Sequence, residues 1–414
     1  METIAEYKAR ARAWVETNLE PLNGADPFMG HAADDREQVV RAKMIMAKLH
    51  EGGYSGICYP KEYGGQGLTK EHQDAFSEAA EGYELPLLFN TPTLTIIMPT
   101  ILDYGTEEQK QRYIPAMLRG EELWVQFLSE PTGGSDLAGA LTKATRDGDV
   151  FVLSGSKIWS TYAWKSDYAV CVCRTNWEVP KHRGLSVLIV KVHQPGIQID
   201  QIRHVDGTEE FCQEFFDDVP IPVENLLGKQ DDGWTVASRL LFHERSAVGG
   251  ASPHMMGGNA ERAARRSGGL SMNDLAAKVG RSDEPAVRQL VGEARVLEHA
   301  HEALVERVSA SIASGRLPSP AGSIPRLSNG MLGVRMASIA IEIAGDHSVA
   351  WEEGDPTGKT GIAYIGRQGA CLGGGSTEMA RNIISERVLG MPRERSDDVD
   401  RPFKDVRTNT MPTR

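Results

Sequence analysis

The sequence predicts an α+β protein in which a helical region, a β-rich region and a second helical region follow one another. Three observations lead to this prediction. Apolar residues recur at helical spacing to about residue 120, short alternating or β-branched runs fill the stretch to about residue 228, and helical spacing then returns. We therefore expect three domains: residues 1–122, 123–228 and 229–414.

The composition agrees with more than one packed domain and argues against several classes of function. A chain of 414 residues with 40% hydrophobic side chains buries more than one compact core. A net charge of −12 with scattered basic residues argues against a nucleic-acid surface. Without a membrane-length apolar run or a signal-like start, a cytoplasmic protein with no membrane span is expected. The five cysteines lack C-x-x-C spacing, so no metal site is expected.

Helix signals mark the first region. The stretch from Glu6 to Val15 has its apolar residues at helical spacing. The sequence Thr106-Glu-Glu-Gln109 is a capping box, which should begin a helix that runs toward Gly120. These signals predict a first region built from helices.

Short β-type runs mark the middle region. Turn residues separate five such runs: Val150–Leu153, Tyr168–Cys173, Leu185–Val190, Ile197–Asp200 and Gln213–Phe216. Runs of this length and spacing predict an antiparallel β barrel or sandwich.

The third region has the pattern of a helical bundle. Long helical segments are expected around residues 231–249, 284–314, 327–345 and 376–389. A loop is expected from Gly315 to Ser323, and the polar tail after Pro392 is expected to pack poorly.

Two motifs stand at the junction of the first and second regions, Trp124–Leu137 and Ser154–Thr161. Taken alone, the Gly-Gly-Ser turn within the first is more often a tight turn than a ligand loop. Together the two motifs resemble the acyl-CoA dehydrogenase family. Three further segments match that family in its order: Pro60–Gly65, Val219–Asn225 and Arg381–Gly390.

This resemblance implies an enzyme of fatty acid or steroid degradation. Members of the family use FAD to remove two hydrogens from the α and β carbons of an acyl-CoA thioester, which gives the trans-2-enoyl-CoA. The resemblance also implies an electron-transfer flavoprotein as the electron acceptor.

A flavin needs hydrogen-bond partners at its edge and an apolar ring against its face. The resemblance assigns flavin contact to seven positions: Gln126, Leu128 and Ser129 at the ring edge, Trp159 and Thr161 over the ring and near N5, and Ser376 and Glu378 in the C-terminal region. By itself Trp159 would more often be a core aromatic, but the residues aligned around it favour the flavin. Ser135 matches a position that faces coenzyme A.

Removal of an α-proton from a thioester requires a carboxylate whose basicity is raised by exclusion of water. At the commoner family position near the C-terminus this chain has Gly374 in place of the glutamate. A second subset, similar to isovaleryl- and long-chain acyl-CoA dehydrogenases, has its glutamate on an earlier helix before an arginine. That subset implies Glu244 as the base and Arg245 near coenzyme A, while the N–H of Gly374 still polarises the thioester carbonyl.

The spacing around Glu244 supports this assignment from the residues alone. One helix face should carry Trp234, Ala237, Leu241, Glu244 and Val248, which are three or four positions apart. A carboxylate would therefore lie in an apolar stripe. The alternative is a structural glutamate that pairs with Arg239 or Arg245.

The chain departs from the family where homotetramers complete a neighbour's FAD site. Residues 264–269 lack the Phe-Gly of the usual motif, and Glu342–Ser348 bring carboxylates to the place of the pyrophosphate. Two explanations stay open. A second acyl-CoA dehydrogenase-like subunit completes the site in an α2β2 heterotetramer, as in enzymes that act on steroid side-chain CoA thioesters, or the chain self-associates and binds FAD by other contacts.

The Gly-rich stretch Gly249–Gly258 follows the helix that carries Glu244. It should shorten that helix and widen the acyl pocket, which favours a bulky or steroid side-chain acyl group. Two other functions stay open: a flavin oxidase or monooxygenase on the same fold, and a non-catalytic partner subunit. Glu244 favours α-proton abstraction over the first, and intact Trp159 and Thr161 argue against the second.

Overall fold

The computed structural model describes residues 2–23, 35–87, 91–205, 207–248, 252–257, 270–352, 355–396 and 398–407. The chain divides into two compact units. The first unit comprises Met1–Glu244, Pro253–Met256 and Glu394–Arg414, and the second comprises Arg245–Ser252 and Gly257–Arg393. The separation of the first unit into two domains stays a prediction.

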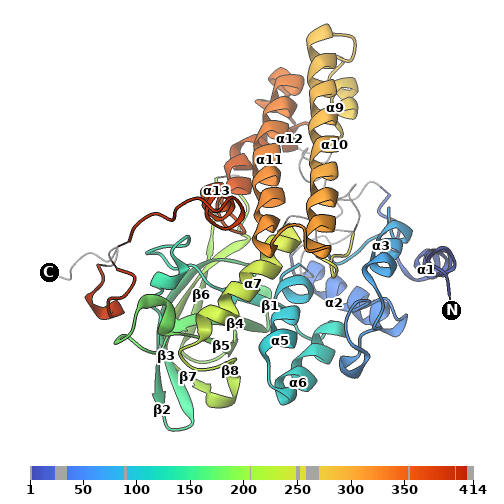
Figure 1. The fold of residues 1–414 in the computed structure, drawn as a ribbon. Coiled ribbons are helices and arrows are strands. Elements are labelled where there is room, and N and C mark those ends of the chain that lie inside the picture. The colour runs from blue at the N-terminus through green and yellow to red at the C-terminus, as the bar shows by residue number, and fades with distance from the viewer. Residues whose placement is uncertain are drawn as a thin grey trace. The chain divides into compact units, whose positions relative to one another are not determined.

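Helices make up the amino-terminal half of the first unit (Figure 1). They are α1 (Ile4–Asn18), α2 (Asp35–Glu51), α3 (Lys70–Ala79), α5 (Met98–Tyr104) and α6 (Glu107–Leu118). The predicted capping box is confirmed, because the Thr106 hydroxyl accepts from the Gln109 amide N–H at 3.2 Å while the Gln109 side chain accepts from the Thr106 N–H at 3.0 Å. The helical first region is thus as expected.

An eight-stranded sheet completes the first unit. Its strands are β1 (Trp124–Phe127), β2 (Lys143–Asp147), β3 (Val150–Thr161), β4 (Tyr168–Arg174), β5 (Leu185–Lys191), β6 (Ile197–Ile202), β7 (Phe211–Pro222) and β8 (Leu226–Leu227). The order is β6-β7-β3-β2-β4-β5-β8, with β1 paired to β4. The sheet is open and mixed rather than an antiparallel barrel, because β1–β4 and β2–β4 are parallel. Alternation along a strand reports which face is buried and not which way its neighbour runs.

The sheet core lies around β4 and β5. Both strands are buried on both faces, which explains their continuous apolar sequences. Cys171 and Cys173 belong to this core as buried free thiols. β3 and β7 are longer and pair irregularly at two bulges, near Gly155 and at Trp159. The second bulge shapes the candidate site.

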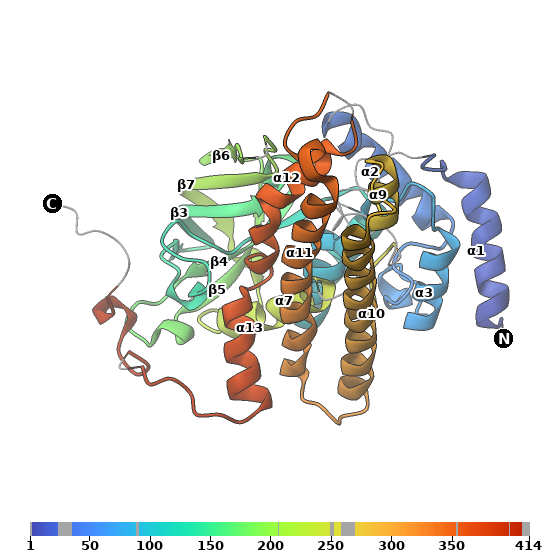
Figure 2. The ribbon, with the colours of Figure 1, turned by 90° about the horizontal axis from the view of Figure 1, so that it is seen from above.

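The second unit is a helical bundle. It contains α9 (Met272–Lys278), α10 (Pro285–Ala313), α11 (Ser323–Ala344), α12 (Gly358–Gly366) and α13 (Thr377–Ile383), and Figure 2 shows α10 and α11 side by side. α7 (Gly233–Val248) runs from the first unit into the second. The expected loop before α11 holds a short 3₁₀ turn, Ser319–Gly322.

The expectation for the tail holds in part. Most of its described residues are exposed, but Phe403 is buried in the first unit. A polar composition hides this contact, which depends on one aromatic side chain.

In the described part of the chain, no helix has both the length and the apolar character that crossing a membrane requires.

Candidate active site

The structure brings together the first-unit residues that were assigned to the flavin. Gln126 lies in β1, Leu128 and Ser129 follow it, and Trp159 and Thr161 lie at the end of β3. The Ser129 carbonyl accepts from the Ile158 N–H at 2.9 Å. The Leu128 carbonyl accepts from the Lys157 ammonium at 2.8 Å. The chain after β1 is therefore fixed to β3 immediately before Trp159.

Trp159 is the most unusual residue of this region. Ile158 and Ser160 pair with β7, but Trp159 falls in the bulge between them with a left-handed φ of 68°. Its side chain is 54% exposed, so Trp159 is not a core aromatic. A left-handed backbone at a non-glycine residue costs about 1–2 kcal/mol. Strain of this kind concentrates at functional sites, where it presents a side chain to a ligand.

Gln126 presents an unsatisfied acceptor in the same region. Its side-chain carbonyl oxygen is buried and has no hydrogen-bond partner among the described residues. Leaving such a group unpaired costs about 1–3 kcal/mol. A ligand with an N–H donor at its edge would satisfy the oxygen. Together with the exposed ring of Trp159, this orphaned acceptor fits the pyrimidine edge and face of a flavin.

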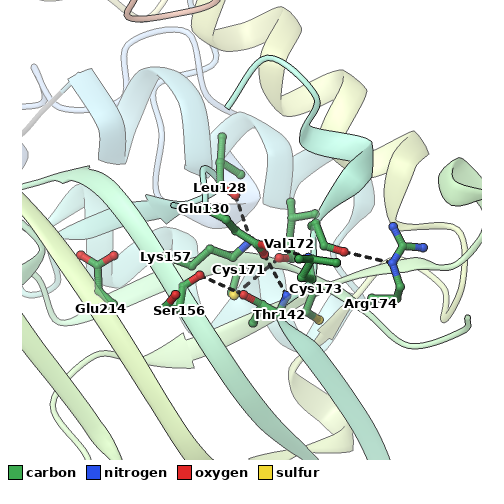
Figure 3. A network of polar contacts seen from close by, with 12 residues as sticks. Leu128, Glu130, Thr142, Ser156, Lys157, Cys171, Val172, Cys173, Arg174 and Glu214 are labelled. Carbon is green, nitrogen blue, oxygen red and sulfur yellow. Dashed lines mark hydrogen bonds and ion pairs between the residues drawn. The ribbon is translucent and has the colours of Figure 1, made fainter. Parts of the chain in front are cut away.

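A buried ion pair supports the loop after β1 (Figure 3). The fully buried Lys157 donates to the Glu130 carboxylate at 2.9 Å. That carboxylate also accepts from the backbone N–H groups of Leu141 (2.6 Å) and Thr142 (2.9 Å). Burial acts to raise the pKa of Glu130, but the charge of Lys157 and the hydrogen bonds outweigh it, so the pKa lies below its ordinary value. Glu130 is therefore a structural anion.

Ser135 lies on the surface of this loop, as a contact to coenzyme A would require. A tight turn precedes it, in which Glu130 and Gly133 exchange backbone hydrogen bonds of 2.9 and 3.0 Å. Asp136 follows it and forms an ion pair with Lys181 at 2.8 Å. Ser135 is exposed between these two fixed points.

Glu244 lies near the end of α7 and is half-buried. The buried side of this helix is formed by Gly233, Val236, Ala237, Leu240 and Ala247. Glu244 is four positions after Leu240 and three before Ala247, so it shares their face. The buried face includes Ala237 as expected, whereas Trp234 and Leu241 are half-buried at its edge. The side chain of Val248 lies outside the described residues.

Sequence reasoning missed a polar cluster that fixes α7 to α5. The Asp103 carboxylate accepts from Arg239 at 2.6 Å and from His243 Nε2 at 3.0 Å. The charge of Arg239 is thus balanced by Asp103. Burial lowers the pKa of His243, although Asp103 opposes this effect. The signal in the sequence was the i, i+4 spacing of Arg239 and His243, which places both on one helix face.

The remaining assigned residues belong to the second unit. Gly374 and Gly375 have left-handed φ values of 71° and 86°, a conformation that favours glycine. Ser376 caps α13 by accepting from the Met379 N–H at 3.1 Å. Glu378 is exposed and pairs with Arg381 at 3.1 Å. Arg245 is half-buried.

The acidic segment expected near the pyrophosphate is partly held in place. Glu342 pairs with Arg335 at 3.2 Å, and Arg281 donates to the carbonyls of Glu342 and Ile343. Asp346 is exposed. Both carboxylates are surface groups of the second unit. Residues 264–269 and four residues of the Gly-rich stretch, namely 249–251 and 258, lie outside the described residues.

Known proteins match this chain along nearly its whole length. The N-terminal, middle and C-terminal domains of acyl-CoA dehydrogenase match residues 2–121, 126–219 and 231–389. Acyl-CoA dehydrogenase IpdE1 of Mycobacterium tuberculosis is 32% identical over 95% of this chain and 99% of its own.

Solved structures agree with these sequence matches. The Tcur3481–Tcur3483 steroid ACAD has a TM-score of 0.77 at 26% identity and covers 94% of this chain and 98% of its own. The ChsE4–ChsE5 complex of M. tuberculosis has a TM-score of 0.73 at 25% identity with the same coverage. These matches cover the strained tryptophan and the glutamine with the unpaired oxygen, and they lead to one conclusion: the chain belongs to the acyl-CoA dehydrogenase family.

Proposed function

We propose that this chain oxidises a bulky acyl-CoA thioester to the trans-2-enoyl-CoA, with FAD as the cofactor and Glu244 as the base. Two observations carry the proposal: Trp159 is exposed with a left-handed backbone, and the amide oxygen of Gln126 is buried without a partner among the described residues. Both features cost folding free energy in the protein alone, and a flat ligand with an N–H edge compensates both.

The residues that would hold the flavin follow from this arrangement. Gln126 would accept from the N–H of its pyrimidine edge, with Leu128 and Ser129 beside it. Trp159 would cover the ring, and Thr161 would approach N5. Ser376 and Glu378 are proposed contacts from the second unit. When bound, the flavin supplies the chemistry of accepting the hydride that leaves the β carbon of the acyl group.

Glu244 would take the α-proton. A half-buried carboxylate on the apolar face of α7 is shielded from water on one side, which favours a stronger base. The ion pairs from Arg239 and His243 to Asp103 fix the helix that carries it. The N–H of Gly374 would donate to the thioester carbonyl as negative charge develops there. Ser135 and Arg245 would contact coenzyme A.

The substrate class rests on the relatives. One structural relative is described as a steroid ACAD, which supports an acyl group attached to a ring system. Comparing kcat/KM for a ring-bearing acyl-CoA and a straight short-chain acyl-CoA tests this point. Activity confined to straight short chains would reject the proposed specificity. An electron-transfer flavoprotein is the proposed electron acceptor.

The replacement Glu244→Gln tests the assignment of the base. The amide keeps the size of the side chain but cannot take a proton, so turnover should fall about 10²- to 10⁴-fold. Flavin absorbance and acyl-CoA affinity should stay close to those of the unchanged protein. Glu16→Gln, at an exposed i, i+4 pair with Arg12 on α1, is the matched control and should leave turnover unchanged.

Undiminished turnover in Glu244→Gln would show that the base lies elsewhere. If the assembled complex kept full activity, this chain would be a non-catalytic partner subunit. Hydrogen peroxide formed in proportion to substrate consumed would instead indicate a flavin oxidase. These outcomes separate the proposed dehydrogenase from its two alternatives.

A further inference from the structure

The chain returns to the sheet after the last helix of the second unit. The family match ends at residue 389, and the short 3₁₀ turn Phe403–Asp405 lies beyond it. The Phe403 N–H donates to the Val179 carbonyl at 2.9 Å, and the Lys404 N–H donates to the Trp177 carbonyl at 3.1 Å. The Phe403 side chain is only 2% exposed. This segment is therefore docked on the first unit by both backbone and side chain.

Phe403 covers an unusual buried cation. The guanidinium carbon of Arg174 lies 3.6 Å from the centre of the Phe403 ring, and the Arg174 side chain is fully buried. Three backbone carbonyls accept from this guanidinium: Ala138 at 2.6 Å, Ala140 at 3.0 Å and Lys181 at 3.1 Å. Arg174 thus ties the segment after the Gly-Gly-Ser-Asp turn to the Lys181 loop. The ring of Phe403 closes the cluster from the other side.

The tail and the turn line the same open hollow on the surface of the first unit. Phe403, Val406 and Arg407 form one side of it. Thr132, Gly133 and Asp136 also line it. The tail therefore lies directly beside the loop that carries Ser135.

We propose that residues 402–407 are a positioning element of the substrate site: Phe403 holds Arg174 in place, and Arg174 holds the Ser135 loop in the form that binds coenzyme A. The proposal rests on the proposed function, which assigns Ser135 to coenzyme A. Arginine over an aromatic face is attracted by the ring quadrupole, and the attraction strengthens where water is excluded. Without the ring, water would enter beside the guanidinium and compete for its bonds to the carbonyls of Ala138 and Ala140.

The test compares Phe403→Ala and Phe403→Leu with Phe215→Ala in the otherwise complete protein. Phe215 is an aromatic of β7 that is 38% exposed, so its loss should affect neither readout. The first readout is amide hydrogen exchange, which should become faster at residues 138–140 in Phe403→Ala. The second is the affinity for coenzyme A by calorimetry, which should fall by about fivefold or more. Phe403→Leu fills the space without a ring. Its exchange rate and its affinity for coenzyme A should lie between those of Phe403→Ala and those of the protein without a replacement.

Unchanged affinity for coenzyme A in Phe403→Ala would overturn the proposal, even if exchange rose, because the contact would then serve stability alone. Unchanged exchange at residues 138–140 would overturn it as well. Failure of the proposed function looks different. If the protein without a replacement binds coenzyme A but oxidises no acyl-CoA, the dehydrogenase proposal is rejected. The effect of Phe403 on coenzyme A binding can still be measured in that case.

Discussion

Glu214 is a buried carboxyl group next to the bulge that presents Trp159. It is fully buried on β7 and accepts a hydrogen bond from the Ser160 hydroxyl at 3.0 Å. Burial raises the pKa of Glu214 to about 8, against the opposing effects of Ser160 and Lys157. The group is therefore mostly protonated at neutral pH. It fixes the residue that follows Trp159 in the strand.

This ionisation predicts a loss of stability in alkali. Since the pKa of Glu214 is about 8 in the folded chain and near 4.5 when solvated, the folded state binds the extra proton between these values. The contribution to stability is complete below the lower value and is lost as the pH rises through the higher one. Between pH 6 and pH 9 the free energy of unfolding should decrease in both the natural protein and Glu214→Gln. We expect the decrease to be about 1–3 kcal/mol smaller in Glu214→Gln, which has no group to ionise at this position. Urea unfolding at both pH values measures this, with the exposed Glu209→Gln as control. Equal losses in all three proteins would contradict the assignment.

Replacement of Trp159 should separate stability from cofactor binding. Glycine accepts a φ of 68° without strain, and a ring that is 54% exposed contributes little burial. Trp159→Gly should therefore keep the free energy of unfolding of the flavin-free protein or raise it by about 1 kcal/mol at most, which the thermal midpoint reports. In the assembled complex its flavin affinity, measured by fluorescence titration, should fall by up to about tenfold. A drop of several degrees in the midpoint would mean that the ring serves the fold.

Sequence reasoning reached Trp159 but not its conformation. Its left-handed φ follows from a bulge against β7, which lies about fifty positions further along the chain, and local patterns do not encode such a pairing. Glu214 gave no signal because a glutamate in an alternating strand normally faces water. Its burial depends on Lys157 and Ser160 of a neighbouring strand.

Among the secondary-structure elements, α6 shows how one side chain joins a helix to the sheet. Gln109 caps the first turn, and its amide also donates to the carbonyls of Glu224 (2.8 Å) and Leu226 (3.0 Å). The capping role was readable from the sequence because its partner is three positions away. The two bonds to the end of the sheet were not, because they span more than a hundred positions.

Gln109→Ala should therefore lower the free energy of unfolding by more than the loss of a helix cap alone would. It removes two hydrogen bonds to partly buried carbonyls and one from the Thr106 backbone N–H, so we expect a loss of about 2–4 kcal/mol in the free energy of unfolding. Gln111→Ala on the same helix removes an exposed bond to Glu107 and should cost less than about 0.5 kcal/mol. Chemical denaturation measures both. Similar costs for the two variants would show that the contacts with Glu224 and Leu226 add nothing.

Elements without a strong pattern were missed. β2 has the sequence Lys143–Asp147 with a single buried residue, and β8 has two residues. Their pairing partners define them, since neither carries an apolar alternation of its own. The predicted antiparallel arrangement also depended on which strands pair. β1 and β4 are parallel neighbours in the sheet, although β2 and β3 lie between them in the sequence.

At the scale of the whole molecule, the order of helical, β and helical regions and the family could be predicted. Periodicity gave the first, and the motifs at Trp124–Leu137 and Ser154–Thr161 gave the second. The division into two compact units could not be predicted, because it depends on which surfaces of the sheet and helices meet.

The surface of the second unit carries both apolar and acidic side chains. Its described residues expose eight large apolar side chains: Val296, Met331, Val349, Trp351, Ile365, Leu372, Leu389 and Met391. The nearby carboxylates of Glu342 and Asp346 would repel the anionic half of a neighbour's FAD.

We therefore expect the chain expressed alone to be nearly colourless. Coexpression with a second acyl-CoA dehydrogenase-like subunit should give a yellow α2β2 complex with one FAD for each complete site. The visible spectrum and the native mass measure both properties. A yellow assembly of this chain alone, with stoichiometric FAD, would reject the heteromer and favour self-association.

The contact between Arg174 and Phe403 also sets an order of events during synthesis. The two residues lie about 230 positions apart in the chain. At ribosomal speeds of about 5–20 residues per second, the ring is made roughly 10–45 s after the arginine. For that interval the sheet can fold, but the guanidinium of Arg174 lacks the aromatic ring that covers it. A nascent chain would thus carry a nearly finished sheet before Arg174 and the carbonyls that it binds reach their final environment.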